Sequence, residues 1–135
     1  MTAMKNRPTE QVISPEQAGT LAGLFYERVT RTPDALAYRF FDERRESWTD
    51  LSWAETGTQV GRGQAALSGE DLRPGDRVAV MMQNCPEWVM FDQAAHANGL
   101  VVVPFYTQDR AENAAYILQN SGAKLLVIGA QEHWD

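Results

Sequence analysis

The chain has 135 residues, of which 44% are hydrophobic and 22% charged, a balance typical of one globular domain. Its formal net charge of −6 disfavours nucleic acids and anionic membranes as partners. A single cysteine, Cys85, excludes an internal disulfide and fits a reducing compartment, so we expect a cytoplasmic protein. No apolar run approaches the ~20 residues of a membrane span, and the N-terminus lacks the apolar stretch of a signal peptide.

The first part of the chain gives no sign of regular structure. Residues 1–18 are polar and show no hydrophobic period, so we expect a flexible arm. Thr20 then has the side chain and position of a helix N-cap. Apolar residues follow at helical spacing, at Leu21, Leu24, Phe25 and Val29, with the stem of Arg28. The sequence Thr32-Pro33-Asp34 ends this helix.

An aromatic-rich segment and a short return segment predict a β-hairpin. Ala35–Phe41 forms the first strand, the charged residues 42–46 form a solvated loop, and Trp48–Leu51 forms the second strand. One face of the first strand is expected to hold Leu36, Tyr38 and Phe40.

The hairpin is followed by a helix with a clear start. Ser52 and Glu55 have the spacing of a capping box, and the helix is expected to reach about Leu67 and end near Gly69. Three glycines lie within it, at Gly57, Gly61 and Gly63. Glycines on a helix more often allow close packing than bind a ligand, so we expect packing here.

From Arg77 onward the pattern changes to short continuous apolar runs. Val78–Met82, Val101–Val103 and Leu125–Ile128 are typical of strands buried on both faces. Pro86 opens a helix between the first two strands, and Asn98-Gly99 closes it.

A second helix is expected between the last two strands. Asp109 and Glu112 start it in a box-like spacing, and Gly122 ends it. Its inner face is expected to hold Ala111, Ala114, Ala115 and Leu118. The whole chain is therefore predicted to be an α/β fold: a three-layer-like parallel β-α-β-α-β sheet with right-handed crossovers, preceded by a helix, a β-hairpin and a helix.

Ligands of open parallel sheets lie beyond the carboxyl ends of the strands. Asn84 follows the first predicted parallel strand, and Tyr106 and Thr107 follow the second, so these three residues are the candidates for a binding site. Helix capping competes with this interpretation. Asn84 or Cys85 would cap one helix, and Thr107 or Asp109 the next.

No motif in the sequence carries catalysis. The glycine-rich patterns that cradle phosphates are absent, and no nucleophile or zinc-protease motif occurs. The two histidines, His96 and His133, are too isolated for a metal site, and His96 falls in a helical pattern where a structural role is expected. We therefore predict no catalytic and no metal-binding residue.

Several segments, taken in order, resemble the AMP-forming acyl-CoA synthetase and adenylate-forming family. They are TLAGLF at 20–25 with TPDALA at 32–37, WTDLSWAE at 48–55, LRPGDRVAV at 72–80, NCPEW at 84–88, ANGLVVVP at 97–104, and AYIL at 115–118 with SGAK at 121–124. Cys85 departs from the family's commoner serine. The phrases are more similar to fatty-acyl-CoA ligases than to peptide-synthetase modules.

The resemblance implies that these segments are scaffold. The family's phosphate-binding loop and catalytic lysine would lie further along a parent enzyme, so residues 19–135 are expected to be an incomplete N-terminal α/β subdomain. ATP, Mg and CoA are implied for that parent, and no cofactor for this chain.

Two functions are compatible with these observations. The first is the N-terminal scaffold of an ATP-dependent fatty-acid–CoA ligase, inactive as this chain, whose partner is the rest of the enzyme. The second is a free-standing, non-catalytic α/β binding or self-association domain. A sheet with an unpaired edge favours a homo-oligomer.

Overall fold

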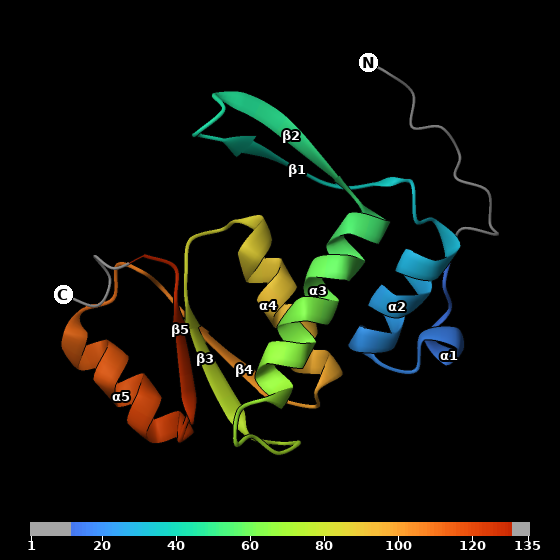
Figure 1. The fold of residues 1–135 in the computed structure, drawn as a ribbon. Coiled ribbons are helices and arrows are strands. Elements are labelled where there is room, and N and C mark those ends of the chain that lie inside the picture. The colour runs from blue at the N-terminus through green and yellow to red at the C-terminus, as the bar shows by residue number, and fades with distance from the viewer. Residues whose placement is uncertain (1–11, 131–135) are drawn as a thin grey trace.

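The structure is a computed structural model that describes residues 12–130. The helices are α1 (Pro15–Ala18), α2 (Leu21–Arg31), α3 (Trp53–Ser68), α4 (Pro86–Ala97) and α5 (Ala111–Ser121) (Figure 1). The strands are β1 (Leu36–Asp42), β2 (Ser47–Ser52), β3 (Arg77–Met81), β4 (Val101–Phe105) and β5 (Leu125–Ile128). Within residues 12–130, no helix has both the length and the apolar composition needed to cross a bilayer.

The three parallel strands have the order β4-β3-β5, so the first of them in the chain lies in the middle. Val78 of β3 pairs with Val102 on one side and Leu125 on the other. The chain moves one way across the sheet to reach β4 and the other way to reach β5. Because such crossovers are right-handed, α4 and α5 lie on opposite faces (Figure 1). The predicted three-layer parallel β-α-β-α-β sheet is therefore confirmed.

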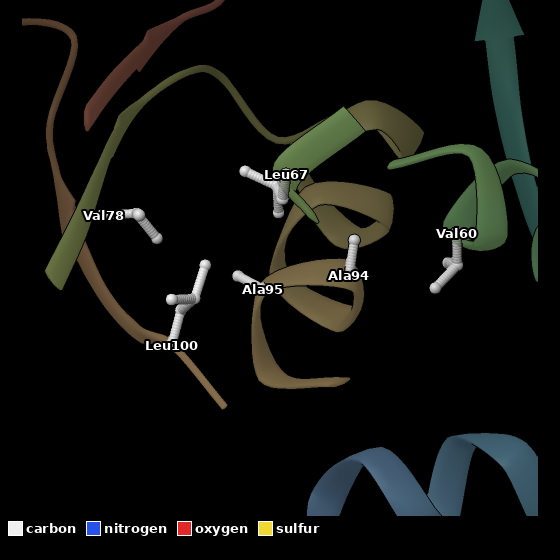
Figure 2. Close-up of a cluster of buried hydrophobic side chains, with 6 residues drawn as sticks. All are labelled: Val60, Leu67, Val78, Ala94, Ala95 and Leu100. Carbon is white, nitrogen blue, oxygen red and sulfur yellow. The ribbon is translucent and has the colours of Figure 1, made fainter. Parts of the chain in front are cut away.

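Two apolar cores fill the spaces between these layers. The first lies between β3 and the helices α3 and α4, and Figure 2 shows its buried side chains: Val60, Leu67, Val78, Ala94, Ala95 and Leu100. The second lies on the other face, where Ala79, Met81 and Phe105 are buried against half-buried side chains of α5. Strand β3 contributes to both cores because successive side chains of a strand point to opposite faces.

Small residues set the spacing of the helices around the first core. A Cβ atom added at Gly63 would lie 3.0 Å from the Cβ of Ala94, and one added at Gly57 would lie 2.8 Å from Cγ1 of Val29. Both glycines therefore allow close packing, as predicted. Gly61 differs, because a Cβ atom there would meet nothing within 4 Å.

The inner face of α5 differs from the prediction. Ala114 and Leu118 pack against the second core as expected, but Ala111 and Ala115 are exposed, and Ile117 takes their place. The prediction placed the alanines on the buried side of the helix. In the structure the larger apolar side chains determine which side is buried. Strands β4 and β5 are also less buried than predicted, because each lies at an edge of the described sheet.

The β1–β2 hairpin projects from the body of the molecule (Figure 1). Two exposed pairs link its strands: Arg39 Nη2 donates to Asp50 Oδ2 at 2.7 Å, and the rings of Phe41 and Trp48 lie 5.7 Å apart. The register is irregular between Leu36 and Tyr38. The prediction that Leu36 shares the face of Tyr38 and Phe40 fails at this irregularity, since Leu36 is 53% exposed while the other two are half-buried.

The helix starts follow the predicted capping chemistry. The Thr20 hydroxyl accepts from the N–H of Gly23 at 2.9 Å, and Ser52 and Glu55 form the capping box of α3. The short helix α1 was not predicted. It lies at the end of the segment expected to be a flexible arm, and it is started by a capping box at Ser14. Residues 1–11 of that arm lie outside the described residues.

Polar contacts close the end of the sheet where the parallel strands begin. The Arg77 guanidinium donates to the carbonyl oxygens of Ser121, the last residue of α5, at 2.8 Å and of its C-cap Gly122 at 3.4 Å. Beside it, Lys124 Nζ donates to Asp76 Oδ2 at 2.8 Å. These contacts tie the connection before β5 to the start of β3, and they leave the opposite end of the sheet as the place for a site.

Candidate functional site

The strand order creates a crevice at the carboxyl ends of β3 and β4. The chain leaves β3 toward α4 on one face of the sheet and leaves β4 toward α5 on the other, so the two connections diverge. Crevices at such reversals of strand order are the usual ligand sites of open α/β sheets. A hollow of about 480 Å³ lies here, lined by Met82, Gln83, Asn84, Trp88, Pro104, Phe105, Tyr106, Thr107 and Gln108.

All three candidate residues line this one hollow. Asn84 comes from the connection between β3 and α4, and Tyr106 and Thr107 come from the connection between β4 and α5. The sequence analysis missed the other lining side chains. Gln83 and Gln108 directly flank the candidates in the sequence, so the same argument from strand ends could have included them. Trp88 lies inside α4, and whether its side chain reaches the hollow depends on the direction in which that helix leaves the sheet.

Helix capping does not account for these residues. The N-cap of α4 is Cys85, and the N-cap of α5 is Arg110; neither makes a side-chain cap hydrogen bond within the described residues. The carboxylate of Asp109 instead accepts from the backbone N–H of Tyr106 at 3.1 Å, which closes the turn after β4. Of the four capping candidates, Cys85 alone stands at an N-cap position, and it does so without a side-chain cap hydrogen bond. Neither Thr107 nor Asp109 is the N-cap of α5.

Cys85 directly follows Asn84 of the hollow and is the N-cap residue of α4. It is half-buried, and burial raises the pKa of its thiol, so the thiol remains protonated at neutral pH. The nearby Glu87 carboxylate acts in the same direction on this pKa. These properties are in keeping with the structural role of a small half-buried side chain.

The hollow is polar without being charged. Among the described residues that line it, none carries a formal charge at neutral pH. No group of three potential metal ligands occurs within residues 12–130. His96 lies in α4 with its Nδ1 2.9 Å from the carbonyl oxygen of Asp92, in keeping with a role within its own helix. His133 lies outside the described residues.

A second hollow of about 320 Å³ lies where α2 meets the base of the hairpin. Its lining includes Phe25, Tyr38, Trp53 and Gln93. The buried Oε1 of Gln93 has no hydrogen-bond partner among the described residues, and burial raises the pKa of Tyr38. Nothing in the strand topology brings chain ends or loops together here, so the hollow at the ends of β3 and β4 remains the stronger candidate.

Comparison with known proteins gives consistent matches. The family model "AMP-binding enzyme" matches residues 25–135. The long-chain-fatty-acid–CoA ligase FadD15 of Mycobacterium tuberculosis is 32% identical over 114 residues, which are 84% of this chain and 18% of the relative. An uncharacterized protein of the same organism, Rv1549, is 29% identical over 126 residues, which are 93% of this chain and 69% of the relative.

A solved structure agrees with these sequence matches. A Mycobacterium tuberculosis fatty acyl CoA synthetase superimposes with a TM-score of 0.75 at 26% identity. The match covers 84% of this chain and 22% of the synthetase. The chain therefore spans about a fifth of the length of FadD15 and of this synthetase.

Proposed function

Because this chain belongs to the AMP-binding enzyme family, we propose that it is the N-terminal scaffold portion of an ATP-dependent fatty-acid–CoA ligase. The observation that carries this proposal is the family match over residues 25–135, together with the likeness to FadD15. The parent enzyme would activate a carboxylate as an acyl-adenylate, release pyrophosphate, and transfer the acyl group to CoA.

The isolated chain is proposed to be catalytically inactive. Phosphoryl and adenylyl transfer requires preorganised donors and a metal ion around the phosphates. The donor set of the hollow does not fit Mg-ATP, because its lining side chains offer neither a cation for the phosphates nor a carboxylate for the metal. ATP, Mg and CoA are therefore assigned to the parent enzyme, and no catalytic step is derived for residues of this chain.

An ATP–pyrophosphate exchange assay tests the inactivity. The 135-residue chain is incubated with labelled pyrophosphate, ATP, Mg²⁺ and a series of fatty acids, with a full-length ligase as positive control. We expect no exchange above the level without protein. Fatty-acid-dependent exchange by the purified chain would overturn the assignment.

The parentage has a separate test in the reading frame after the codon for Asp135. A downstream stretch rich in serine, threonine and glycine and ending in a lysine is expected there, since such a loop cradles ATP phosphates. A stop codon with no such stretch elsewhere in the same transcript would argue against the parent enzyme.

A free-standing self-association domain is the second candidate. Two observations favour it: the match to Rv1549, of which this chain spans 69%, and the two edges of the described sheet. β4 and β5 each pair with one strand only in the part of the chain that the structure describes, and Val101 at one edge is 48% exposed. Edges of this kind favour pairing with another copy. Light scattering at micromolar concentration should then give a homodimer or larger, and a clean monomer would contradict this candidate.

The cytoplasm is the proposed location of the chain. Its single cysteine leaves no second cysteine for an internal disulfide, which fits a reducing compartment. Fractionation of cells that express the tagged protein tests this, and recovery in the membrane or secreted fraction would contradict it.

A further inference from the structure

We propose that the second hollow, of about 320 Å³ between α2 and the base of the hairpin, binds a small uncharged aromatic molecule that donates one hydrogen bond, as a phenol does. The inference does not depend on the ligase assignment, because it concerns the side chains around this hollow alone. It rests on three observations: an aromatic and apolar wall, a buried oxygen without a partner, and charges of both signs near the lining.

Three elements supply the aromatic wall of the second hollow. Phe25 comes from α2, Tyr38 from β1 and Trp53 from the start of α3, and α2 lies beside α3 (Figure 1). The ring of Trp53 lies 6.0 Å from that of Phe25 at an interplanar angle of 66°, and 5.8 Å from that of Tyr38 at 58°. Neither pair stacks in parallel, so the three half-buried rings form a bent wall. A further ring packs well against such a wall, because aromatic pairs prefer inclined or offset contacts.

The rim of the second hollow is apolar as well. Leu21 and Leu24 of α2 belong to the lining, and they are 66% and 41% exposed. A ligand ring seated against them removes apolar surface from water, which favours binding. Because these two side chains face solvent, the hollow is also accessible from outside.

The carboxamide of Gln93 in α4 gives the lining an unpaired acceptor. Its Nε2 donates to Asp92 Oδ2 at 3.4 Å. A carboxylate only accepts hydrogen bonds, so this contact holds the nitrogen toward Asp92 and the oxygen away from it. The buried Oε1 then has no hydrogen-bond partner among the described residues. An unpaired buried acceptor is costly, so a ligand that donates to it supplies a hydrogen bond that the fold lacks.

A small rotation gives a ligand access to this oxygen. Gln93 is half-buried and lines the second hollow. The last torsion of a glutamine side chain is broad, so the carboxamide turns without leaving a favourable rotamer. Because the oxygen only accepts, the ligand has to donate. This requirement selects a ring with an O–H or N–H group over a hydrocarbon of the same shape.

The charges around the second hollow do not select an ion. Arg28 contributes a positive group to the lining. Burial raises the pKa of Tyr38, and the carboxylate of Asp92 acts in the same direction, so a negative group also lies close to the lining. Tyr38 itself is a neutral phenol at neutral pH. With both signs present, an uncharged ligand fits the hollow better than an anion or a cation.

The size of the second hollow sets the size of the probe. A volume of about 320 Å³ lies near the lower end of the range for small-molecule sites. A single substituted ring is therefore appropriate. Phenol is the probe, toluene is its matched comparison of the same shape without a donor, and benzoate is the charged comparison.

The test is a titration of the ¹⁵N-labelled 135-residue chain, followed by NMR. We expect phenol to cause saturable shifts at millimolar concentration. They should be confined to the amides of residues 21–28, 38 and 53, the indole N–H of Trp53 and the carboxamide N–H groups of Gln93. Benzoate should bind no more tightly than phenol.

A leucine in place of Gln93 isolates the hydrogen bond. Gln93→Leu keeps a similar side-chain size and removes the unpaired oxygen, so the fold should be retained, which the amide spectrum checks. It should weaken phenol binding about fivefold, the effect of losing one hydrogen bond, without weakening toluene binding. The control variant Gln119→Leu makes the same change at an exposed position of α5 and should leave the binding of both probes unchanged.

A second variant tests the apolar rim independently. Leu24→Ala removes part of a side chain that is 41% exposed, so the fold should again be retained. Because Leu24 offers apolar surface and no hydrogen bond, this variant should weaken phenol and toluene binding by a similar factor, about threefold.

Four results would overturn the proposal. The first is the absence of saturable shifts with phenol at millimolar concentration. The second is tenfold tighter binding of benzoate than of phenol, which would indicate an anion site at Arg28. The third is a Gln93→Leu variant that changes phenol and toluene binding by the same factor, which would mean that Oε1 accepts no hydrogen bond from the ligand. The fourth is unchanged binding of both probes by Leu24→Ala, which would place the ligand elsewhere.

Discussion

Strand β3 and the β1–β2 hairpin hold their apolar side chains in opposite environments. In β3, Val78, Ala79 and Val80 have no exposed surface, and strands pair with both edges. In the hairpin, Phe41 and Trp48 are 49% and 69% exposed, although their side chains are larger. The comparison predicts that burial, more than side-chain size, decides how much a side chain stabilises this fold. The hairpin depends instead on cross-strand pairs and on its attachment to the body.

That attachment is aromatic. Trp53, the first residue of α3, lies 5.8 Å from the ring of Tyr38 in β1 and 6.0 Å from the ring of Phe25 in α2. The base of the hairpin is thus fixed to two helices, whereas its outer part, with Phe41 and Trp48, contacts mainly itself. The two regions should therefore respond differently to the same kind of substitution.

The largest difference is expected between Val78→Ala and Phe41→Ala. Val78→Ala removes two methyl groups from a fully buried site and should lower the free energy of unfolding by about 2 kcal/mol. Phe41→Ala removes a larger side chain, but from an exposed pair, and should cost less than about 1 kcal/mol. Urea unfolding followed by circular dichroism measures both. Val101→Ala, at a 48% exposed position, is the control for Val78→Ala. Equal losses of unfolding free energy at Val78 and Phe41 would contradict the expected difference between the buried strand and the hairpin.

The glycines of α3 allow buried and open positions to be compared within one helix. Replacing Gly by Ala in a helix interior gains about 1 kcal/mol of helix propensity. Gly61→Ala should therefore raise the free energy of unfolding by somewhat less than this, since its Cβ meets open space. Gly57→Ala should lower the free energy of unfolding by about 1 kcal/mol, because the stiff Val29 side chain cannot move away easily.

Thermal or urea unfolding of the two glycine variants provides the measurement. Opposite signs are the expected outcome. A stabilising Gly57→Ala would show that α2 and α3 can separate without cost, and the aromatic attachment around Trp53 would then be weaker than its geometry indicates.

The smallest expected effect is on the way the free energy of unfolding falls at acidic pH. Hydrogen bonds from Lys124 and from the backbone of Arg73 lower the pKa of Asp76, and the bond from Arg39 lowers the pKa of Asp50 in the hairpin. A carboxylate with a lowered pKa contributes stability above its ordinary pKa of about 4, and this contribution is lost as the pH falls through its lower folded pKa.

Asp76→Asn should therefore make the loss of stability below about pH 4 less steep. Asp50→Asn should change it less, because the Asp50 side chain is 49% exposed and that of Asp76 only 13%. Urea unfolding at several pH values and low salt measures both slopes. A larger change for Asp50→Asn would mean that the hairpin pair contributes more than the pair at the end of the sheet.

Much of the fold was predictable because its signals are local. Thr20 and Ser52 indicate helix starts because their side chains can cap a helix. The apolar runs of the three parallel strands are short and continuous, which is typical of buried strands. The errors lie where the answer depends on distant residues. The buried side of α5 is set by how Ile117 meets the sheet, and the position of Leu36 is set by an irregular register with β2.

The candidate site was predictable in part for the same reason. Parallel strands end at one edge of a sheet, so Asn84, Tyr106 and Thr107 were expected to lie together, and they line one hollow. The contribution of Trp88 was not predictable, because it depends on the angle at which α4 leaves the sheet. Asp109 was offered as a cap of α5 but closes the turn after β4, because aspartate suits both caps and turns.

The central position of β3 also has a consequence for synthesis on the ribosome. β3 is made first of the three parallel strands, yet its second neighbour, β5, is the last element of the described chain. Until β5 emerges, one edge of an entirely apolar strand segment, Val78–Met81, has no partner from the described sheet. Pairing of strands distant in the sequence is slow, and open edges invite association between nascent chains. β3 therefore has two open edges until β4 is made and one open edge until β5 is made, so its pairing is complete only at the end of the described chain.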